Sequence, residues 1–100
     1  MNVLVVEFDE EYAAAVEWGY RAKGHDVEVA PDIQKAREIL ELGGIDQVVI
    51  NYYMGFRKRA EELLNGEGGV IRYRVDESKI IKNGYSEPSD IASKCIKKVR

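Results

Sequence analysis

The sequence predicts an α/β domain in which helices cover both faces of a mainly parallel β-sheet. Over residues 3–66, three strand-like segments alternate with three amphipathic, helix-like segments. Strands joined through helices pair in parallel with right-handed crossovers, and the helices pack against the faces of the sheet. The expected architecture is therefore a three-layer sandwich. One hundred residues suit one compact unit, so residues 1–100 are predicted to form a single domain.

The predicted strands are short runs rich in β-branched residues. Val3–Val6 and Ile45–Ile50 are mostly continuous apolar runs, which are typical of strands covered on both faces. Asp26–Ala30 alternates polar and apolar residues, as a strand at the edge of a sheet does. Val70–Val75 is predicted to be a fourth strand, with two arginines on the face opposite its apolar side chains.

Each predicted helix has residues that favour its start or its end. Asp9 can cap a first helix, which ends at Gly24. Pro31-Asp32 begin a second helix, which ends at Gly43-Gly44, and residues 57–65 form a third. The residues predicted to face inward at helical spacing are Tyr12, Ala15, Val16, Gly19, Tyr20, Ile33, Ala36, Ile39, Leu40, Ala60, Leu63 and Leu64.

The segment that follows Val75 has two competing interpretations. If Lys79–Lys82 is a strand, the three residues before it force an antiparallel hairpin, because a parallel crossover needs a dozen or more residues. If the segment is helical, Asp76 and Gly84 cap a helix of two turns. The hairpin is favoured, since two arginines on one strand face suggest that no helix packs there.

A final helix is predicted to begin near Pro88, Ser89 or Asp90. Its last turn is rich in lysine and arginine, which suits the C-terminal end of a helix. Its predicted buried stripe is Ile91, Ala92, Cys95, Ile96 and Val99, and its predicted outer face is Lys94, Lys97, Lys98 and Arg100.

The composition limits the classes of function. The net charge of -3 disfavours nucleic acid and anionic membranes as partners, and the mixed charges suit a thermophilic protein. With neither a membrane-length apolar run nor a signal-peptide pattern, the chain is expected to be cytoplasmic. Cys95 is the single cysteine, so no disulfide or thiol-based metal cluster is expected. No catalytic triad, phosphate-binding loop or dinucleotide fingerprint is present, so neither an enzyme nor a cofactor or metal site is predicted.

Four segments together resemble the receiver domains of two-component response regulators. Residues 3–11 resemble the strand-one signature of an aliphatic run followed by acidic residues, and residues 24–30 resemble the link into strand two. Residues 46–54 resemble strand three with its phosphoacceptor, and residues 86–90 resemble the Lys-Pro segment before the last helix. The resemblance implies a CheY-like, flavodoxin-like fold with strand order 2-1-3-4. The short stretch between residues 75 and 88 implies a fifth strand that is short and antiparallel or missing, and a fourth helix that is absent or very short.

Departures from the receiver pattern predict a scaffold that lacks phosphoryl chemistry. Asn51 stands at the phosphoacceptor position, and a carboxamide is a poor nucleophile. Phe8 replaces one residue of the acidic pair, which leaves Glu7 as a hard oxygen ligand for Mg²⁺. Glu87 stands where the family has its lysine, and Arg74 lies near the switch Ser/Thr. Around Asn51, the degenerate acidic pocket is predicted to comprise Glu7, Phe8, Asp9, Arg74 and Glu87.

Two functions from different classes are predicted. The first is a stand-alone pseudo-receiver that binds a protein partner or a second copy of itself without phosphorylation. The alternative is a sensor of a small ligand or cation, or a weak enzyme, that uses acidic residues at the strand ends. For Asp9 a capping role is favoured, whereas Asn51 is equally suited to ligand binding and to bonding loop backbone. The candidate partner contacts are Trp18, Tyr52, Tyr53, Met54, Phe56 and Arg72.

Overall fold

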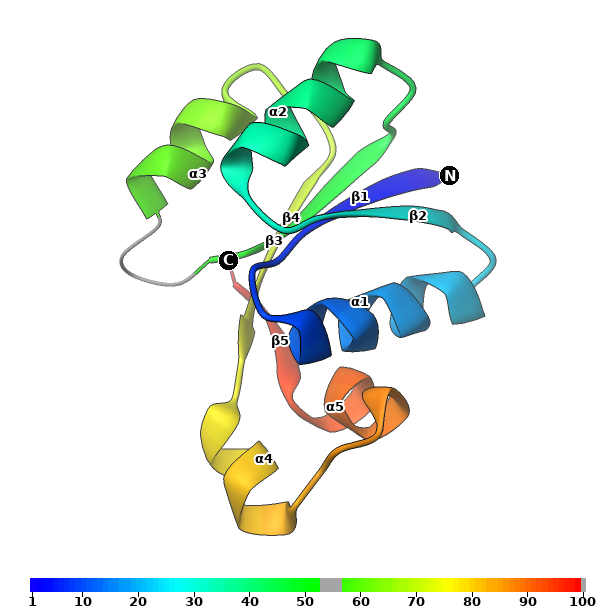
Figure 1. Ribbon diagram of the computed structural model, residues 1–100, viewed down its shortest axis with the longest axis vertical. Helices are drawn as coiled ribbons and strands as arrows, with labels where there is room; N and C mark the ends of the chain where they lie inside the picture. The colour runs from blue at the N-terminus through cyan, green and yellow to red at the C-terminus, as the bar shows by residue number, and fades with distance from the viewer. Residues whose placement is uncertain (53–56, 100) are drawn as a thin grey trace.

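Within the residues that the structure describes, five strands form one sheet in the order β2-β1-β3-β4-β5. The computed structural model describes residues 1–52 and 57–99, and Figure 1 shows helices above and below the sheet. The first four strands are parallel, and β5 is antiparallel to β4. The α/β class and the strand order 2-1-3-4 are confirmed, and the fifth strand is the short antiparallel one. The strands are β1 (Asn2–Val6), β2 (Asp26–Ala30), β3 (Gln47–Asn51), β4 (Val70–Val75) and β5 (Ile96–Val99).

The helices divide between the two faces of the sheet. Helices α2 and α3 pack on one face, and α1 and α5 pack on the other, which confirms the three-layer sandwich. In the part of the chain that the structure describes, no helix is long and apolar enough to cross a bilayer. The helices are α1 (Glu10–Ala22), α2 (Ile33–Leu42), α3 (Arg57–Leu64), α4 (Glu77–Asn83) and α5 (Pro88–Lys94).

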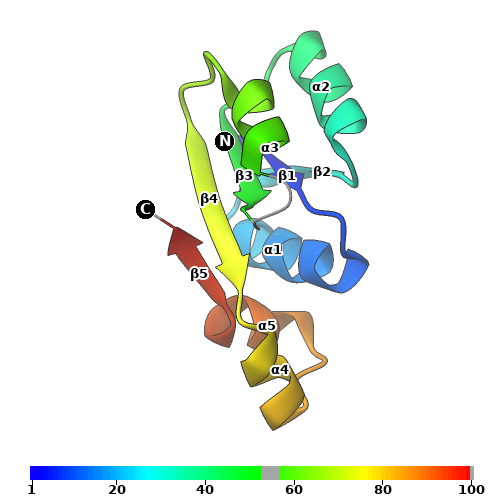
Figure 2. The ribbon, with the colours of Figure 1, turned by 90° about the vertical axis from the view of Figure 1, so that its left-hand side faces the viewer.

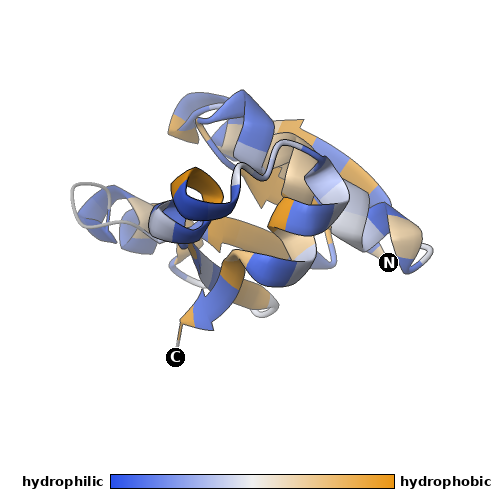
Figure 3. Cartoon of the chain, turned by 90° about the horizontal axis from the view of Figure 1, so that it is seen from below, coloured by the Kyte–Doolittle hydropathy of each residue, from blue (hydrophilic) through white to orange (hydrophobic). Residues whose placement is uncertain are grey.

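The central strand β1 supplies side chains to both halves of the core. Leu4 and Val6 join the cluster under α2 and α3, whereas Val3 and Val5 join the cluster under α1. This division follows from the pleat, which sends successive side chains to opposite faces. In Figure 3, hydrophobic colours run along the central strands, whereas the helices alternate between hydrophobic and hydrophilic segments.

Side-chain caps fix the starts of the first two helices. The carboxylate of Asp9 accepts hydrogen bonds from the backbone N–H groups of Glu11 (2.9 Å) and Tyr12 (3.1 Å). The carboxylate of Asp32 accepts one from Lys35 N–H at 2.8 Å. These contacts satisfy donors that the first helical turn leaves unpaired, so the predicted helix starts are confirmed.

The favoured hairpin at Lys79–Lys82 is wrong, because these residues lie in helix α4. Asp76 caps this helix by accepting a hydrogen bond from Lys79 N–H at 3.3 Å. Gly84 ends it in the left-handed conformation, with φ of 66°. Ile80 then packs against the cluster formed by α1 and α5. Local capping and this apolar contact together stabilise two helical turns, so the fourth helix is very short.

The predicted final helix is also too long. It ends at Lys94, and Ile96–Val99 forms strand β5 beside β4, as Figure 2 shows. The pairing places Val99 opposite Arg72 and Ile96 opposite Val75. It satisfies backbone groups along β4 that would otherwise form an open edge, and β-branched residues suit such a strand. Cys95 is fully buried as predicted, whereas Arg100 lies outside the described residues.

The close approach of β4 to β3 gives a test of the parallel pairing. A Cβ added at Gly69 would lie 2.6 Å from the carbonyl oxygen of Asp46, whereas one added at Gly68 would meet nothing within 4 Å. We expect Gly69→Ala to lower the free energy of unfolding by about 1–3 kcal/mol, because the backbone must move. Urea denaturation measures this. Gly68→Ala is the matched control and should change stability by less than about 0.5 kcal/mol. Equal stability of the two variants would contradict the arrangement of β3 and β4.

Candidate functional site

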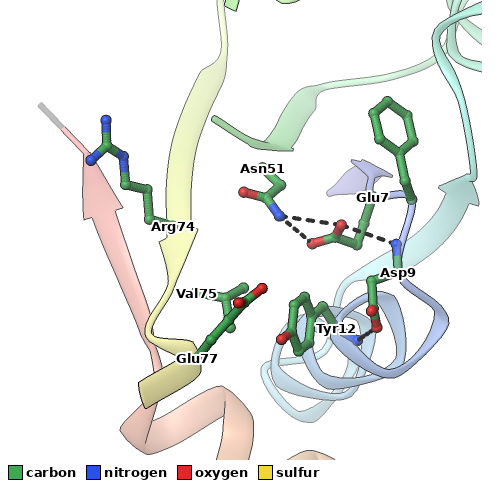
Figure 4. Close-up of a pocket in the computed structure, with 8 residues that line it drawn as sticks. Glu7, Asp9, Tyr12, Asn51, Arg74, Val75 and Glu77 are labelled. Carbon is green, nitrogen blue, oxygen red and sulfur yellow. Dashed lines mark hydrogen bonds between the residues drawn. The ribbon is translucent and has the colours of Figure 1, made fainter. Parts of the chain in front are cut away.

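A cleft of about 410 Å³ lies at the carboxyl ends of β1, β3 and β4. Parallel strands bring the residues that follow them to the same edge of a sheet, which is where α/β proteins commonly bind ligands. Figure 4 shows that the side chains come from these strand ends and from the starts of α1 and α4. The lining residues are Glu7, Phe8, Asp9, Tyr12, Asn51, Arg74, Val75 and Glu77.

The centre of the cleft is the carboxylate of Glu7, which follows β1. Glu7 is 3% exposed, and it is the buried charged residue of the described chain. Its Oε1 accepts hydrogen bonds from the hydroxyl of Tyr73 at 2.7 Å and from Nδ2 of Asn51 at 2.9 Å. Its Oε2 accepts one from the backbone N–H of Asp9 at 3.2 Å. Donors from two neighbouring strands and a helix cap therefore compensate a buried charge.

Burial and hydrogen bonding act in opposite directions on the pKa of Glu7. Burial raises this pKa above its ordinary value, since a low dielectric disfavours the charged form. The hydrogen bonds from Tyr73, Asn51 and the backbone lower it, and they offset only part of the rise. Burial and the adjacent Glu7 charge also raise the pKa of Tyr73. The phenol therefore stays protonated and donates to the carboxylate.

Asn51 is the last residue of β3 and lies opposite Tyr73 in the register of β3 and β4. Its Nδ2 donates to both oxygens of Glu7, at 2.9 and 3.3 Å, as Figure 4 shows. An aspartate here would face Glu7 with a second negative charge and would require a proton or a cation between the two groups. The amide removes that requirement, because a neutral donor meets the carboxylate directly.

Asp9 lines the cleft, but its carboxylate points toward the first turn of α1. The two backbone hydrogen bonds that it accepts there make it the cap of that helix. Phe8, beside it, is 38% exposed. Within the described residues, no group of three His, Cys, Asp or Glu side chains is placed to hold a metal ion. The acidic residues near β1 are thus committed to hydrogen bonds within the protein.

Three lining residues had not been identified from the sequence: Tyr12, Val75 and Glu77. Figure 4 shows the Glu77 carboxylate pointing into the cleft toward Tyr12. Partial burial, followed by the charge of Glu77, raises the pKa of Tyr12 to about 12. The signal for Glu77 was present in the sequence, because it follows the end of a predicted parallel strand by two residues.

Two residues of the predicted acidic pocket do not face the carboxylate of Glu7. Arg74 lines the cleft from β4, but in Figure 4 its guanidinium points away from Glu7. Glu87 does not line the cleft at all and is an exposed residue at the start of α5. The reason is topological. No strand runs between α4 and α5 to bring Glu87 to the sheet edge, so its assignment to the pocket is corrected.

Two of the candidate partner contacts are engaged within the fold. The half-buried ring of Tyr52 lies 5.1 Å from the guanidinium of Arg57 and 5.4 Å from that of Arg72. Arg72 also forms a two-point ion pair with Glu61 of α3, with N–O distances of 3.0 and 3.1 Å. Trp18, on α1, is 49% exposed, in agreement with the sequence. The other three candidates, Tyr53, Met54 and Phe56, lie outside the described residues.

The pKa of Glu7 gives a testable pH dependence. A carboxyl group whose pKa is higher in the folded state stabilises the fold most below its unfolded pKa of about 4.5. That stabilisation is lost as the pH rises through the folded-state pKa. We expect the unfolding free energy of wild type minus that of Glu7→Gln to fall as the pH rises from about 4 to 7. Urea denaturation at several pH values measures the difference, with Glu41→Gln on the exposed face of α2 as the matched control. A difference that grows with pH would contradict the raised pKa.

Comparison with known proteins supports the fold. No family model matched the chain, and no curated protein matched it either. Among solved structures, the chain is similar to the receiver domain of the Francisella response regulator 1452, with 24% sequence identity and a TM-score of 0.58. The match covers 71% of this chain and 63% of that chain, so it spans less than two thirds of the solved domain. The chain therefore has the α/β fold of a response-regulator receiver domain.

Proposed function

We propose that the protein is a stand-alone pseudo-receiver, a signalling module that acts through protein contact and without phosphorylation. The observation that carries this proposal is the hydrogen bond from Asn51 Nδ2 to Glu7 at the end of β3. Asn51 occupies the position at which the receiver resemblance places the phosphoacceptor. The receiver scaffold is retained around this point, while the groups at the point itself serve the stability of the scaffold.

The chemistry of the cleft supports independence from phosphorylation. A carboxamide does not form the acyl phosphate that a carboxylate forms, because it is a poor nucleophile. Mg²⁺ prefers several hard oxygen ligands, yet both oxygens of Glu7 already accept hydrogen bonds and Asp9 caps α1. Binding a cation at Glu7 would require these contacts to break.

Exposed apolar side chains support a role in protein contact. Trp18 on α1 is 49% exposed, and Ile81 on α4 is 82% exposed. Aromatic residues are enriched in protein interfaces, and an exposed tryptophan is a common anchor of binding energy. We propose that a protein partner or a second copy of the chain covers Trp18.

A sensor of a small ligand or cation is the second candidate function, and the size of the cleft favours a small-molecule ligand. The cleft measures about 410 Å³, which falls within the usual range of roughly 300–1,000 Å³ for ligand sites. The carboxylate of Glu77 points into this space and is not buried by the surrounding residues. A small cationic ligand such as an amine, bound at the Glu77 carboxylate, would leave the hydrogen bonds of Glu7 intact.

Treatment with acetyl phosphate tests the main proposal directly. With Mg²⁺ present, the wild-type protein should gain no phosphoryl group, because Asn51 lacks the nucleophilic carboxylate. Intact-mass spectrometry immediately after incubation measures the result, and a phosphorylatable receiver domain treated alongside shows that the donor is active. A stoichiometric phosphoryl adduct on the wild-type chain would contradict the proposal.

Asn51→Asp tests whether the cleft is a cation site from which one carboxylate has been lost. At neutral pH the new charge beside Glu7 should lower the unfolding free energy by about 1–3 kcal/mol. Millimolar Mg²⁺ should restore this loss, because a ligand of the native state raises its stability. Asn51→Ala is the matched control, since it removes the hydrogen bonds and adds no charge, and Mg²⁺ should leave it unchanged. Thermal unfolding measures all three proteins, and stabilisation of the wild type by Mg²⁺ would favour the cation sensor.

A further inference from the structure

A second cavity, of about 230 Å³, lies on the opposite side of the core from α2 and α3. We call it the α1–β5 groove. Its floor is made of buried residues of the sheet and α1, including Val16, Val49 and Tyr73. Its walls are the partly exposed Tyr20, Ile71 and Ile96. Among the described residues, this groove shares no lining residue with the cleft at the strand ends. Tyr73 connects the two, because it lines the groove and its hydroxyl donates to Glu7 of the cleft.

The groove exists because the last helix is short. Helix α1 has 13 residues and α5 has 7, which correspond to about 20 and 10 Å of helix length. Helix α5 reaches Gly19, where an added Cβ would lie 3.7 Å from the Cβ of Ala92. Beyond Gly19, the described part of the chain places no helix beside α1 on this face, since α5 ends at Lys94 and the chain continues into β5. Apolar side chains of β4 and β5 therefore remain partly uncovered.

Two lysines stand at the mouth of the groove. Lys23, at the end of α1, and Lys98, on β5, both line the cavity and are exposed. Lys98 lies opposite Tyr73 in the register of β4 and β5, which places it on the same face of the sheet. Neither lysine forms an ion pair with any acidic residue that the structure describes. An apolar cavity is thus lined by two lysines without an acidic partner, and the Nζ of Lys23 lies 5.9 Å from the ring centroid of Tyr20.

We propose that the α1–β5 groove binds a small amphipathic carboxylate, with its apolar body against Ile71 and Ile96 and its carboxylate between Lys23 and Lys98. Charge complementarity assigns the anionic group, and the apolar floor assigns the hydrophobic body. The cavity is smaller than the roughly 300–1,000 Å³ of drug-sized sites, which favours a short-chain molecule. This inference stands independently of the proposed contact function.

Octanoate is the probe for a direct test on the full chain. In ¹H–¹⁵N correlation spectra recorded below the micellar concentration, octanoate should shift the amide signals of Ile71, Ile96 and Tyr20 in a saturable manner. A dissociation constant of about 1 mM or tighter is expected for a ligand of this size. Octan-1-ol, which has the same chain without the charge, should bind about fivefold more weakly. Butyrate, which keeps the charge and loses apolar contact, should also bind more weakly.

Charge reversals locate the carboxylate. Lys23→Glu and Lys98→Glu should each weaken octanoate binding by about fivefold. Lys97→Glu is the matched control, because Lys97 lies opposite Arg74 and faces away from the groove, so binding should stay within about twofold. If a glutamate variant fails to fold, Lys23→Gln or Lys98→Gln replaces it. The proposal is overturned by an absence of saturable shifts, by equal weakening in Lys97→Glu, or by shifts centred on Asn51 instead of the groove.

Discussion

A buried carboxylate requires hydrogen-bond donors, and the strand-end region of this protein is arranged around that requirement. Glu7 receives its donors from β4, from β3 and from the backbone at the start of α1. A buried charged group left without partners would cost several kcal/mol, so these elements cannot shift relative to one another without a large penalty. The contact between Tyr73 and Glu7 spans 66 residues of sequence and ties the last parallel strand to the first. The hydrogen bonds that hold these elements together are the same ones that occupy the carboxylate of Glu7.

The three hydrogen-bond donors give the Glu7 carboxylate a structural role instead of a cation-binding one. An acidic site that binds a cation keeps carboxylate oxygens available as ligands. The oxygens of Glu7 instead accept hydrogen bonds from an amide, a phenol and a backbone N–H. Asn51 therefore converts a position of potential charge repulsion into a contact that stabilises the fold. The space beyond this contact is bounded instead by Tyr12 of α1 and Glu77 of α4. Any ligand of the cleft would meet these residues first.

Local signals in the sequence were sufficient from β1 to β4 and insufficient for the segments that follow β4. Periodicity and capping residues such as Asp9 and Asp32 act within a few residues, so they identified these elements. The segments Lys79–Lys82 and Ile96–Val99 are short, and tertiary contacts decide between helix and strand for them. Within the site, the strand-end rule brought Glu7 and Asn51 together correctly. The sequence places Tyr73 on the apolar face of its strand, and only the fold shows that its hydroxyl reaches a carboxylate 66 residues away.

The antiparallel strand β5 also links the last third of the chain into one cooperative unit. The backbone N–H of Asp76, which caps α4, donates to the carbonyl of Cys95 at 2.7 Å, immediately before β5. Local opening of β5 would therefore release the start of α4 and expose the edge of β4 together. When β5 is paired with β4 it is itself an edge strand, and its Lys97 and Lys98 oppose pairing with a strand of another molecule. The segment from β4 to the C-terminal strand thus has the properties of a foldon, in which amide protons exchange through a shared opening event.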